Sequence, residues 1–104
     1  MAADIEAVRA EARRYAAAAK AVMPIDCVYL FGSYAKGTAR ELSDVDIAFF
    51  FYGLSDDEIF ELQTHLFTLS RDFNAWFEPL AFSISDLDTD NPFVNEILRT
   101  GIKL

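Results

Sequence analysis

The stretch FGSYAKGTARELSDVDIAFF, from Phe31 to Phe50, joins a Gly-Ser pair to an Asp-x-Asp pair with ten residues between them. Asp44 and Asp46 are spaced i, i+2 at the beginning of an apolar run, so in a strand both carboxylates point to the same side. Two like charges held that close repel each other unless a positive group lies between them. The stretch also constrains the fold, because one apolar run ends at the Gly-Ser pair and another begins at the Asp-x-Asp pair.

The sequence on both sides of this stretch predicts helices and strands in alternation. Apolar residues at helical spacing and the capping box Ser55-x-x-Glu58 predict helices, and short β-rich runs predict strands. The predicted elements are a helix from Asp4 to about Ala21, a strand over 25–31, a short helix over 33–37, a strand over 45–52, a helix over 55–73, a strand over 75–82 and a helix from Asn91-Pro92 to Gly101. The last three residues, IKL, are expected to end the chain outside any element.

This order of elements predicts one α/β domain over residues 1–104, α+β-like in its topology, with helices packed on a small three-stranded mixed sheet. If Gly32-Ser33 and Asp46 share a site, the first and second strands are antiparallel neighbours. The long helix between the second and third strands favours a parallel crossover. Parallel pairing then places Glu78, the one acid in the first half of the third strand, beside Asp46.

The composition limits the partners of the chain. Of 104 residues, 17 are acidic and 9 are basic, which gives a formal net charge of −8. That charge argues against unaided binding to a nucleic-acid backbone. The single cysteine, Cys27, lies in an apolar run and is expected to be a small buried hydrophobe. The chain shows no secretory signal and no membrane-length apolar stretch, so a cytoplasmic protein is expected.

The Gly-Ser pair and the segment after it suit a phosphate group. Gly32 allows a tight turn and close approach of a ligand, and Ser33 supplies a hydroxyl at the beginning of a helix. Lys36 and Arg40, on the intervening segment, are placed to neutralise phosphate charge. Taken singly, a Gly-Ser pair is usually only a turn, and exposed basic residues are common.

The three acids suit a hard cation. Asp44, Asp46 and Glu78 offer the oxygen ligands that Mg²⁺ or Mn²⁺ prefers, and no Cys/His cluster indicates zinc. An isolated Asp-x-Asp pair is weak evidence for a metal site, and a lone glutamate is most often solvated. The combination is more specific, because Gly-Ser, ten residues and Asp-x-Asp are expected by chance about once in several hundred sequences of this composition.

This combination resembles the signature of the polymerase-beta-like nucleotidyltransferase superfamily. The details GSYAKG and SDVDI are most similar to the minimal nucleotidyltransferases of bacteria and archaea. The resemblance implies that Gly32 and Ser33 hold the triphosphate of ATP and that Asp44 and Asp46 bind the metal ions. It also implies that Glu78 is the third acid, which shares a metal and acts as base toward the acceptor hydroxyl.

Two features depart from the family pattern. Glu78 stands where aspartate is commoner, and Pro79 directly after it removes a backbone donor. Lys36 stands where the minimal branch often has arginine, so the charge is kept without a bidentate grip on phosphate. If Glu78 is not the third acid, Glu41 and Asp72 are the other candidates.

The resemblance implies an enzyme that transfers AMP from ATP to a hydroxyl of a protein partner, because minimal nucleotidyltransferases are commonly antitoxins paired with HEPN-domain ribonuclease toxins. Two alternatives stay open: an antitoxin that acts by complex formation alone, and a subunit that senses nucleotide without transfer. An intact triad of acids favours the enzyme. The aromatic excess, with ten Phe, four Tyr and one Trp, favours a protein interface.

Overall fold

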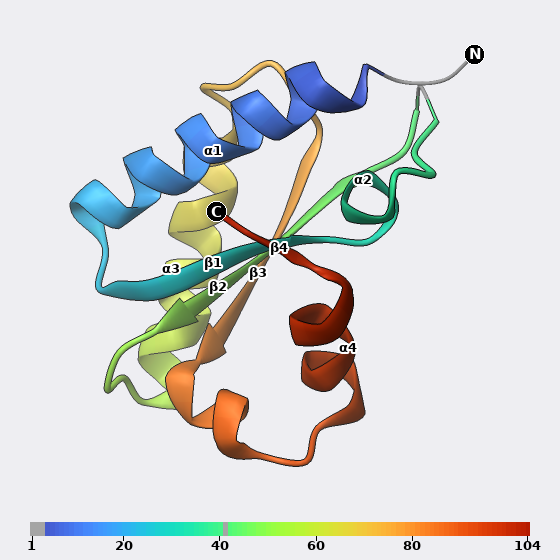
Figure 1. Cartoon of the computed structure of the whole chain (residues 1–104). Helices are drawn as coiled ribbons and strands as arrows, with labels where there is room; N and C mark the ends of the chain where they lie inside the picture. The colour runs from blue at the N-terminus through green and yellow to red at the C-terminus, as the bar shows by residue number, and fades with distance from the viewer. Residues whose placement is uncertain (1–3, 41) are drawn as a thin grey trace.

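In a computed structural model of the protein, which describes residues 4–40 and 42–104, helices pack on both faces of one mixed β-sheet (Figure 1). The elements are, in order, α1 (Ile5–Val22), β1 (Ile25–Phe31), α2 (Ser33–Lys36), β2 (Val45–Phe51), α3 (Asp56–Ser70), β3 (Phe77–Ser83), the 3-10 helix η1 (Ile84–Asp88), α4 (Pro92–Thr100) and β4 (Ile102–Lys103). All predicted helices and strands are present, and η1 and β4 are additional. Within the described residues, no helix has the length and apolar character needed to cross a membrane.

The strand order is β3-β2-β1-β4. β1 and β2 are antiparallel, with Phe31 opposite Asp46, and β2 and β3 are parallel, with Asp46 opposite Glu78. Both pairings agree with the topology predicted from the sequence. The end of β1 and the beginnings of β2 and β3 therefore lie at the same end of the sheet.

The predicted three-stranded sheet is wrong, because the sheet has a fourth strand. β4 pairs antiparallel with β1, with Leu30 opposite Ile102. Gly101 makes this pairing possible, because a Cβ atom there would collide with the carbonyl oxygens of Ile97 and Leu30. A strand of two residues is too short to show an alternating pattern, so the sequence carries no clear signal for it.

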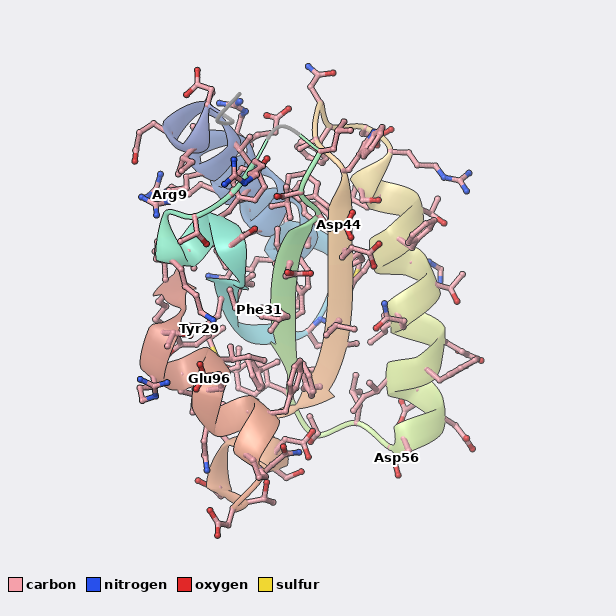
Figure 2. The ribbon with its side chains drawn as sticks, turned by 90° about the vertical axis from the view of Figure 1, so that its right-hand side faces the viewer. Arg9, Tyr29, Phe31, Asp44, Asp56 and Glu96 are labelled. Carbon is pink, nitrogen blue, oxygen red and sulfur yellow. The ribbon has the colours of Figure 1, made fainter. Side chains whose placement is uncertain are left out.

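The side chains of β2 alternate between two apolar clusters on opposite faces of the sheet. Val45, Ile47 and Phe49 lie in the cluster that α1 and α3 cover, whereas Ala48 and Phe50 lie in the smaller cluster that α4 covers. Asp46 therefore projects from the α4 face. Figure 2 looks toward this face, with α4 beside β2 and β3, and with Asp44 labelled at the end of β2 that is remote from Asp56.

Pro79 costs the sheet no hydrogen bond. β3 is an edge strand, and the backbone groups of Pro79 and Ala81 face its outer side. The side chain of Gln63 in α3 covers that side: its amide nitrogen donates to the Pro79 carbonyl at 2.6 Å, and its oxygen accepts from the Ala81 N–H at 2.7 Å. The missing donor of Pro79 would have pointed away from β2, so the proline next to Glu78 is compatible with the parallel pairing.

Candidate active site

The Gly-Ser turn lies directly against the acids of β2. Gly32 has φ 73° and ψ −152°, a backbone region that is essentially restricted to glycine. A Cβ atom on Gly32 would collide with the carboxylate of Asp46. The Gly32 carbonyl accepts the N–H groups of Ala35 and Lys36, both at 3.1 Å. These hydrogen bonds form the first turn of α2, which begins at Ser33. A glycine is therefore required both by the backbone angles and by the space beside Asp46.

The three acids lie together at the beginnings of β2 and β3. Asp44 and Glu78 are exposed, and Asp46 between them is partly buried. Burial raises the pKa of Asp46 above its ordinary value, and the charges of Asp44 and Glu78 raise it further. The three carboxylates therefore share one region of negative potential, which a bound cation would relieve.

The acids fit a metal ion that is bound together with a nucleotide. Among the described residues, no group of three or more His, Cys, Asp or Glu side chains has the arrangement of a complete protein metal site. Mg²⁺ at nucleotide sites is usually held by one or two carboxylates, with phosphate oxygens and water as the other ligands. Asp46 on β2 and the exposed Asp44, which directly precedes β2, are a donor set of that kind.

Within the described residues, neither of the two predicted phosphate-neutralising residues forms an ion pair with the three acids. The Nζ atom of Lys36 lies 3.9 Å from Glu96 Oε1 on α4. Arg40 is exposed in the loop before β2, and its backbone N–H donates to Ser43 Oγ at 2.9 Å. The Lys36–Glu96 pair is half-exposed and therefore weak, so a phosphate group would compete with it effectively.

The sequence left two other acids, Asp72 and Glu41, as candidates for the third acid. Asp72 is exposed in the turn that follows α3. Glu41 lies outside the described residues. Glu78 is the acid that the strand register places beside Asp46.

Arg9 of α1 supports the Gly-Ser turn from behind, a role that the sequence did not indicate. Its Nε atom donates to the Tyr34 carbonyl at 3.0 Å, and its Nη2 atom donates to the Ala35 carbonyl at 3.1 Å. These contacts tie α2 to α1, as the position of Arg9 beside α2 in Figure 2 shows. An arginine on an amphipathic helix ordinarily indicates a solvent-exposed face, so only the tertiary structure reveals this contact.

The sequence predicts that Mg-ATP binds at this turn, and we expect Arg9→Met to weaken that binding by about tenfold, because the carbonyl groups of α2 lose a charged donor and the turn at Ser33 loses its support. The measurement is the increase in melting temperature with Mg-ATP, which is compared with the increase for Arg13→Met. Arg13 is exposed on the same helix. Equal increases for the two variants would show that Arg9 has no part in holding the turn.

Glu11 of α1 fixes the loop that leads into β3. It is only 8% exposed, and its Oε2 atom accepts the Asn74 N–H at 2.8 Å. This hydrogen bond lowers the pKa of Glu11 below its ordinary value, and the hydrogen bond and charge of Arg14 lower it further. The contact holds the loop two residues before Trp76, and so helps to place Glu78.

The lowered pKa gives a pH-dependent contribution to stability. The contribution of Glu11 is complete above the ordinary glutamate pKa and is lost as the pH falls through the lowered folded-state value. We expect Glu11→Gln to decrease the free energy of unfolding at pH 7 and to flatten its decline between about pH 5 and pH 3. Urea unfolding at several pH values measures this. If the free energy of unfolding of Glu11→Gln fell with decreasing pH as steeply as that of the wild type, Glu11 would not be the source of this pH dependence.

This sheet topology, with a glycine turn packed on a carboxylate pair and a third acid on the next strand, defines a small domain of the nucleotidyltransferase type. Residues 16–104 match the family model for "Polymerase beta, Nucleotidyltransferase". The chain belongs to this family.

Solved structures show the same fold. A proposed nucleotidyltransferase from Sulfolobus solfataricus is 21% identical, with a TM-score of 0.63 over 89% of this chain and 75% of that chain. A mutant of the toxin-antitoxin complex MntA-HpeT is 22% identical, with a TM-score of 0.50 over 80% of this chain and 61% of that one. A toxin-antitoxin structure with AMP-PNP is 20% identical, with a TM-score of 0.51 over 97% and 72% of the two chains. No curated protein matches the sequence.

Proposed function

We propose that the protein is a Mg²⁺-dependent nucleotidyltransferase that transfers AMP from ATP to a hydroxyl group of a partner protein. Membership of the family supports the transferase class. The observation that carries the proposal is the contact of Gly32 with Asp46, together with the register that pairs Asp46 with Glu78. A turn suited to phosphate and three acids thus meet at one end of the sheet.

Each residue of the site has a role in this reaction. Gly32 and Ser33 hold the triphosphate, and Asp44 and Asp46 hold Mg²⁺ or Mn²⁺. The bound ion supplies charge neutralisation at the phosphates. Glu78 accepts the proton of the acceptor hydroxyl. The oxygen of that hydroxyl bonds to the α-phosphorus of ATP, and the bond from this phosphorus to pyrophosphate breaks.

Lys36 and Arg40 are proposed to approach the phosphates when nucleotide is bound. Lys36 then exchanges its half-exposed contact with Glu96 for a phosphate oxygen. Arg40 is already exposed in the loop before β2. Both residues would offset the negative charge of the departing pyrophosphate.

We propose that the partner is a HEPN-type ribonuclease toxin and that the protein is its cytoplasmic antitoxin. Two structures with the same fold are toxin-antitoxin assemblies, and one of them was solved with AMP-PNP. The net charge of −8 favours a basic protein surface over RNA as the acceptor. AMP added to a toxin near its RNA-cutting site would bring negative charge to the path of RNA phosphates.

Inhibition by complex formation alone is the second candidate function. It is favoured by apolar side chains that lie in solvent: Leu42 is 76% exposed, Phe60 77% and Trp76 70%. Such residues are enriched at protein interfaces. This function needs no turnover, so loss of the acids would leave it intact.

The experiment that separates the two functions is incubation of the protein with labelled ATP, CTP, GTP and UTP, with Mg²⁺ or Mn²⁺, in the presence and absence of a candidate toxin. We expect label to pass from ATP to the toxin only when a divalent cation is present. A toxin that is inhibited without incorporation of label from any nucleotide would assign the function to binding.

We expect Glu78→Gln to decrease transfer by about 10²–10⁴-fold, the usual contribution of a general base. Mg-ATP binding should persist, because Asp44 and Asp46 remain. Single-turnover transfer and melting with Mg-ATP measure the two effects separately. Full transfer by Glu78→Gln would rule out Glu78 as the base, and Asp72 and Glu41 would then need to be tested.

A further inference from the structure

We infer that one exposed side of α3 binds a second copy of this chain, so that two molecules pack their α3 helices antiparallel about a two-fold axis. This inference does not depend on the proposed function. The side in question, called the α3 stripe below, is formed by Asp56, Phe60, Gln63, Phe67 and Arg71, which recur every three or four residues and therefore lie along one side of the helix. Figure 2 shows α3 alongside β3, with Asp56 labelled at its first turn.

The α3 stripe leaves two large apolar side chains in solvent. Phe60 is 77% exposed and Phe67 is 49% exposed, and aromatic side chains are enriched at protein interfaces. Between them, the side chain of Gln63 is bonded to the Pro79 carbonyl and the Ala81 N–H at the outer side of β3. A partner strand therefore cannot add to the sheet at this point. The stripe suits a partner helix instead, because a helix needs no free backbone groups from it.

The two rings lie symmetrically along the α3 stripe. Phe60 and Phe67 are equally far in sequence from the point midway between Gln63 and Thr64. If two copies meet antiparallel at this point, Phe60 of each copy packs against Phe67 of the other. Gln63 and Thr64 lie next to the axis and carry no charge, so no like charges meet there. A contact of this kind is isologous and closes a two-fold dimer.

The charged ends of the α3 stripe favour a second copy over a basic partner. Asp56 and Arg71 are also equally far from the midpoint of the stripe, so an antiparallel dimer places Asp56 of each copy against Arg71 of the other. Among the ion pairs formed within residues 4–40 and 42–104, none includes either residue. Both side chains are therefore available for a contact between copies. A uniformly basic surface would instead be repelled by Arg71.

The area of the contact predicts a weak dimer. An aromatic side chain buries about 150–250 Å², so the four rings of a dimer, at their exposed fractions, contribute roughly 400–600 Å². Stable interfaces bury about 1,200–2,000 Å². The net charge of −8 on each copy also opposes association. We therefore expect monomer and dimer to exchange reversibly at micromolar protein concentrations.

Sedimentation velocity of the purified protein, from micromolar to submillimolar concentrations, tests the dimer. We expect association to be at least tenfold weaker in Phe60→Ala and in Phe67→Ala, since each ring takes part in the contact on both sides of the axis. Val22→Ala truncates a similarly exposed apolar side chain on α1 and should leave association unchanged. A wild type that stays monomeric throughout this range, or that associates no better than Phe60→Ala, would overturn the inference.

Exchange of the two charges tests the antiparallel geometry itself. Asp56→Arg and Arg71→Asp should each weaken the homodimer at least tenfold, because like charges then face each other at both ends of the contact. An equimolar mixture of the two variants should form mixed dimers about as strong as the wild type, since one copy then has two positive ends and the other has two negative ends. The double variant with both substitutions should also dimerise. No recovery in the mixture and in the double variant would overturn the antiparallel pairing.

The matched control for the charge exchange is Asp57→Arg. It reverses an exposed acid in the same first turn of α3 but outside the stripe, so it carries the same loss of favourable charge at the helix N-terminus. We expect Asp57→Arg to dimerise like the wild type. Equal weakening by Asp57→Arg and Asp56→Arg would attribute the effect to the helix terminus and would overturn the pairing of Asp56 with Arg71.

The same variants separate the dimer from the proposed function. If the wild type is monomeric and Phe60→Ala weakens binding of a candidate toxin instead, the stripe belongs to the toxin and the inference is wrong. The Gly32 turn follows β1, which β2 separates from β3, so the increase in melting temperature with Mg-ATP should be the same in Phe60→Ala and in the wild type. Absence of that increase from a dimerising wild type would contradict the proposed function and support the dimer alone.

Discussion

Asp46→Asn is expected to abolish AMP transfer while it makes the nucleotide-free protein more stable at neutral pH. The loss of activity should exceed about a thousandfold, because the variant removes a charge that holds the metal next to the reacting phosphate. The gain in stability follows from the raised pKa of Asp46, which burial and the charges of Asp44 and Glu78 cause. The two effects have opposite signs in one variant, which an ordinary structural residue would not show.

The sign of the stability change can be checked against pH. An acid with a raised folded-state pKa stabilises the fold at low pH, and this contribution is lost as the pH rises through that value. Asparagine imitates the protonated form, so the variant should be more stable than wild type at neutral pH and should approach it below the ordinary aspartate value of 3.8. Chemical unfolding at both pH values measures the difference.

The control for this prediction is Asp88→Asn, which removes an exposed acid from η1. It changes the net charge by the same amount, and it should leave transfer unchanged. A stability gain in Asp88→Asn equal to that in Asp46→Asn would attribute the effect to net charge. Retained transfer by Asp46→Asn would remove Asp46 from the site.

Gly32→Ala is expected to abolish nucleotide binding and transfer. The added Cβ would collide with the Asp46 carboxylate, and the φ and ψ angles of Gly32 belong to a region that other residues rarely adopt. The turn must therefore move away from β2, which separates the phosphate-holding residues from the acids. Titration with Mg-ATP, followed by melting temperature or calorimetry, should show no binding.

Gly37→Ala is the matched control. Gly37 also has a positive φ, 77°, but a Cβ atom there would have no neighbour within 4 Å. Its substitution should decrease stability by about 1–2 kcal/mol through backbone strain alone and should keep Mg-ATP binding. Equal loss of binding in both variants would indicate a general loss of the fold rather than a specific contact between Gly32 and Asp46.

The arrangement of the acids could be predicted from the sequence because a small number of residues is enough to determine it. Once Gly32 and Asp46 are assumed to share a site, β1 and β2 must be antiparallel, and the crossover through α3 then places Glu78 beside Asp46. The structure has both the antiparallel pairing of β1 with β2 and the pairing of Asp46 with Glu78. The strand and helix boundaries followed from capping residues and apolar spacing, and they were accurate to within a few residues.

The unpredicted features depend on contacts between residues far apart in the chain. Arg9, Glu11 and Gln63 are polar residues on helices, and a pattern of exposed and buried positions says nothing about which backbone groups they reach. β4 depends on space for the backbone at Gly101, which no local pattern shows. A cavity likewise arises where the end of α3 and the beginning of β3 meet.

The most direct test of the central claim is the intact mass of a candidate toxin purified after co-expression with the wild-type protein or with Asp46→Asn. We expect the toxin to carry the mass of one or more AMP units after co-expression with the wild-type protein and no added mass after co-expression with the variant. A toxin that stays unmodified, and is inhibited equally by both forms, would contradict it.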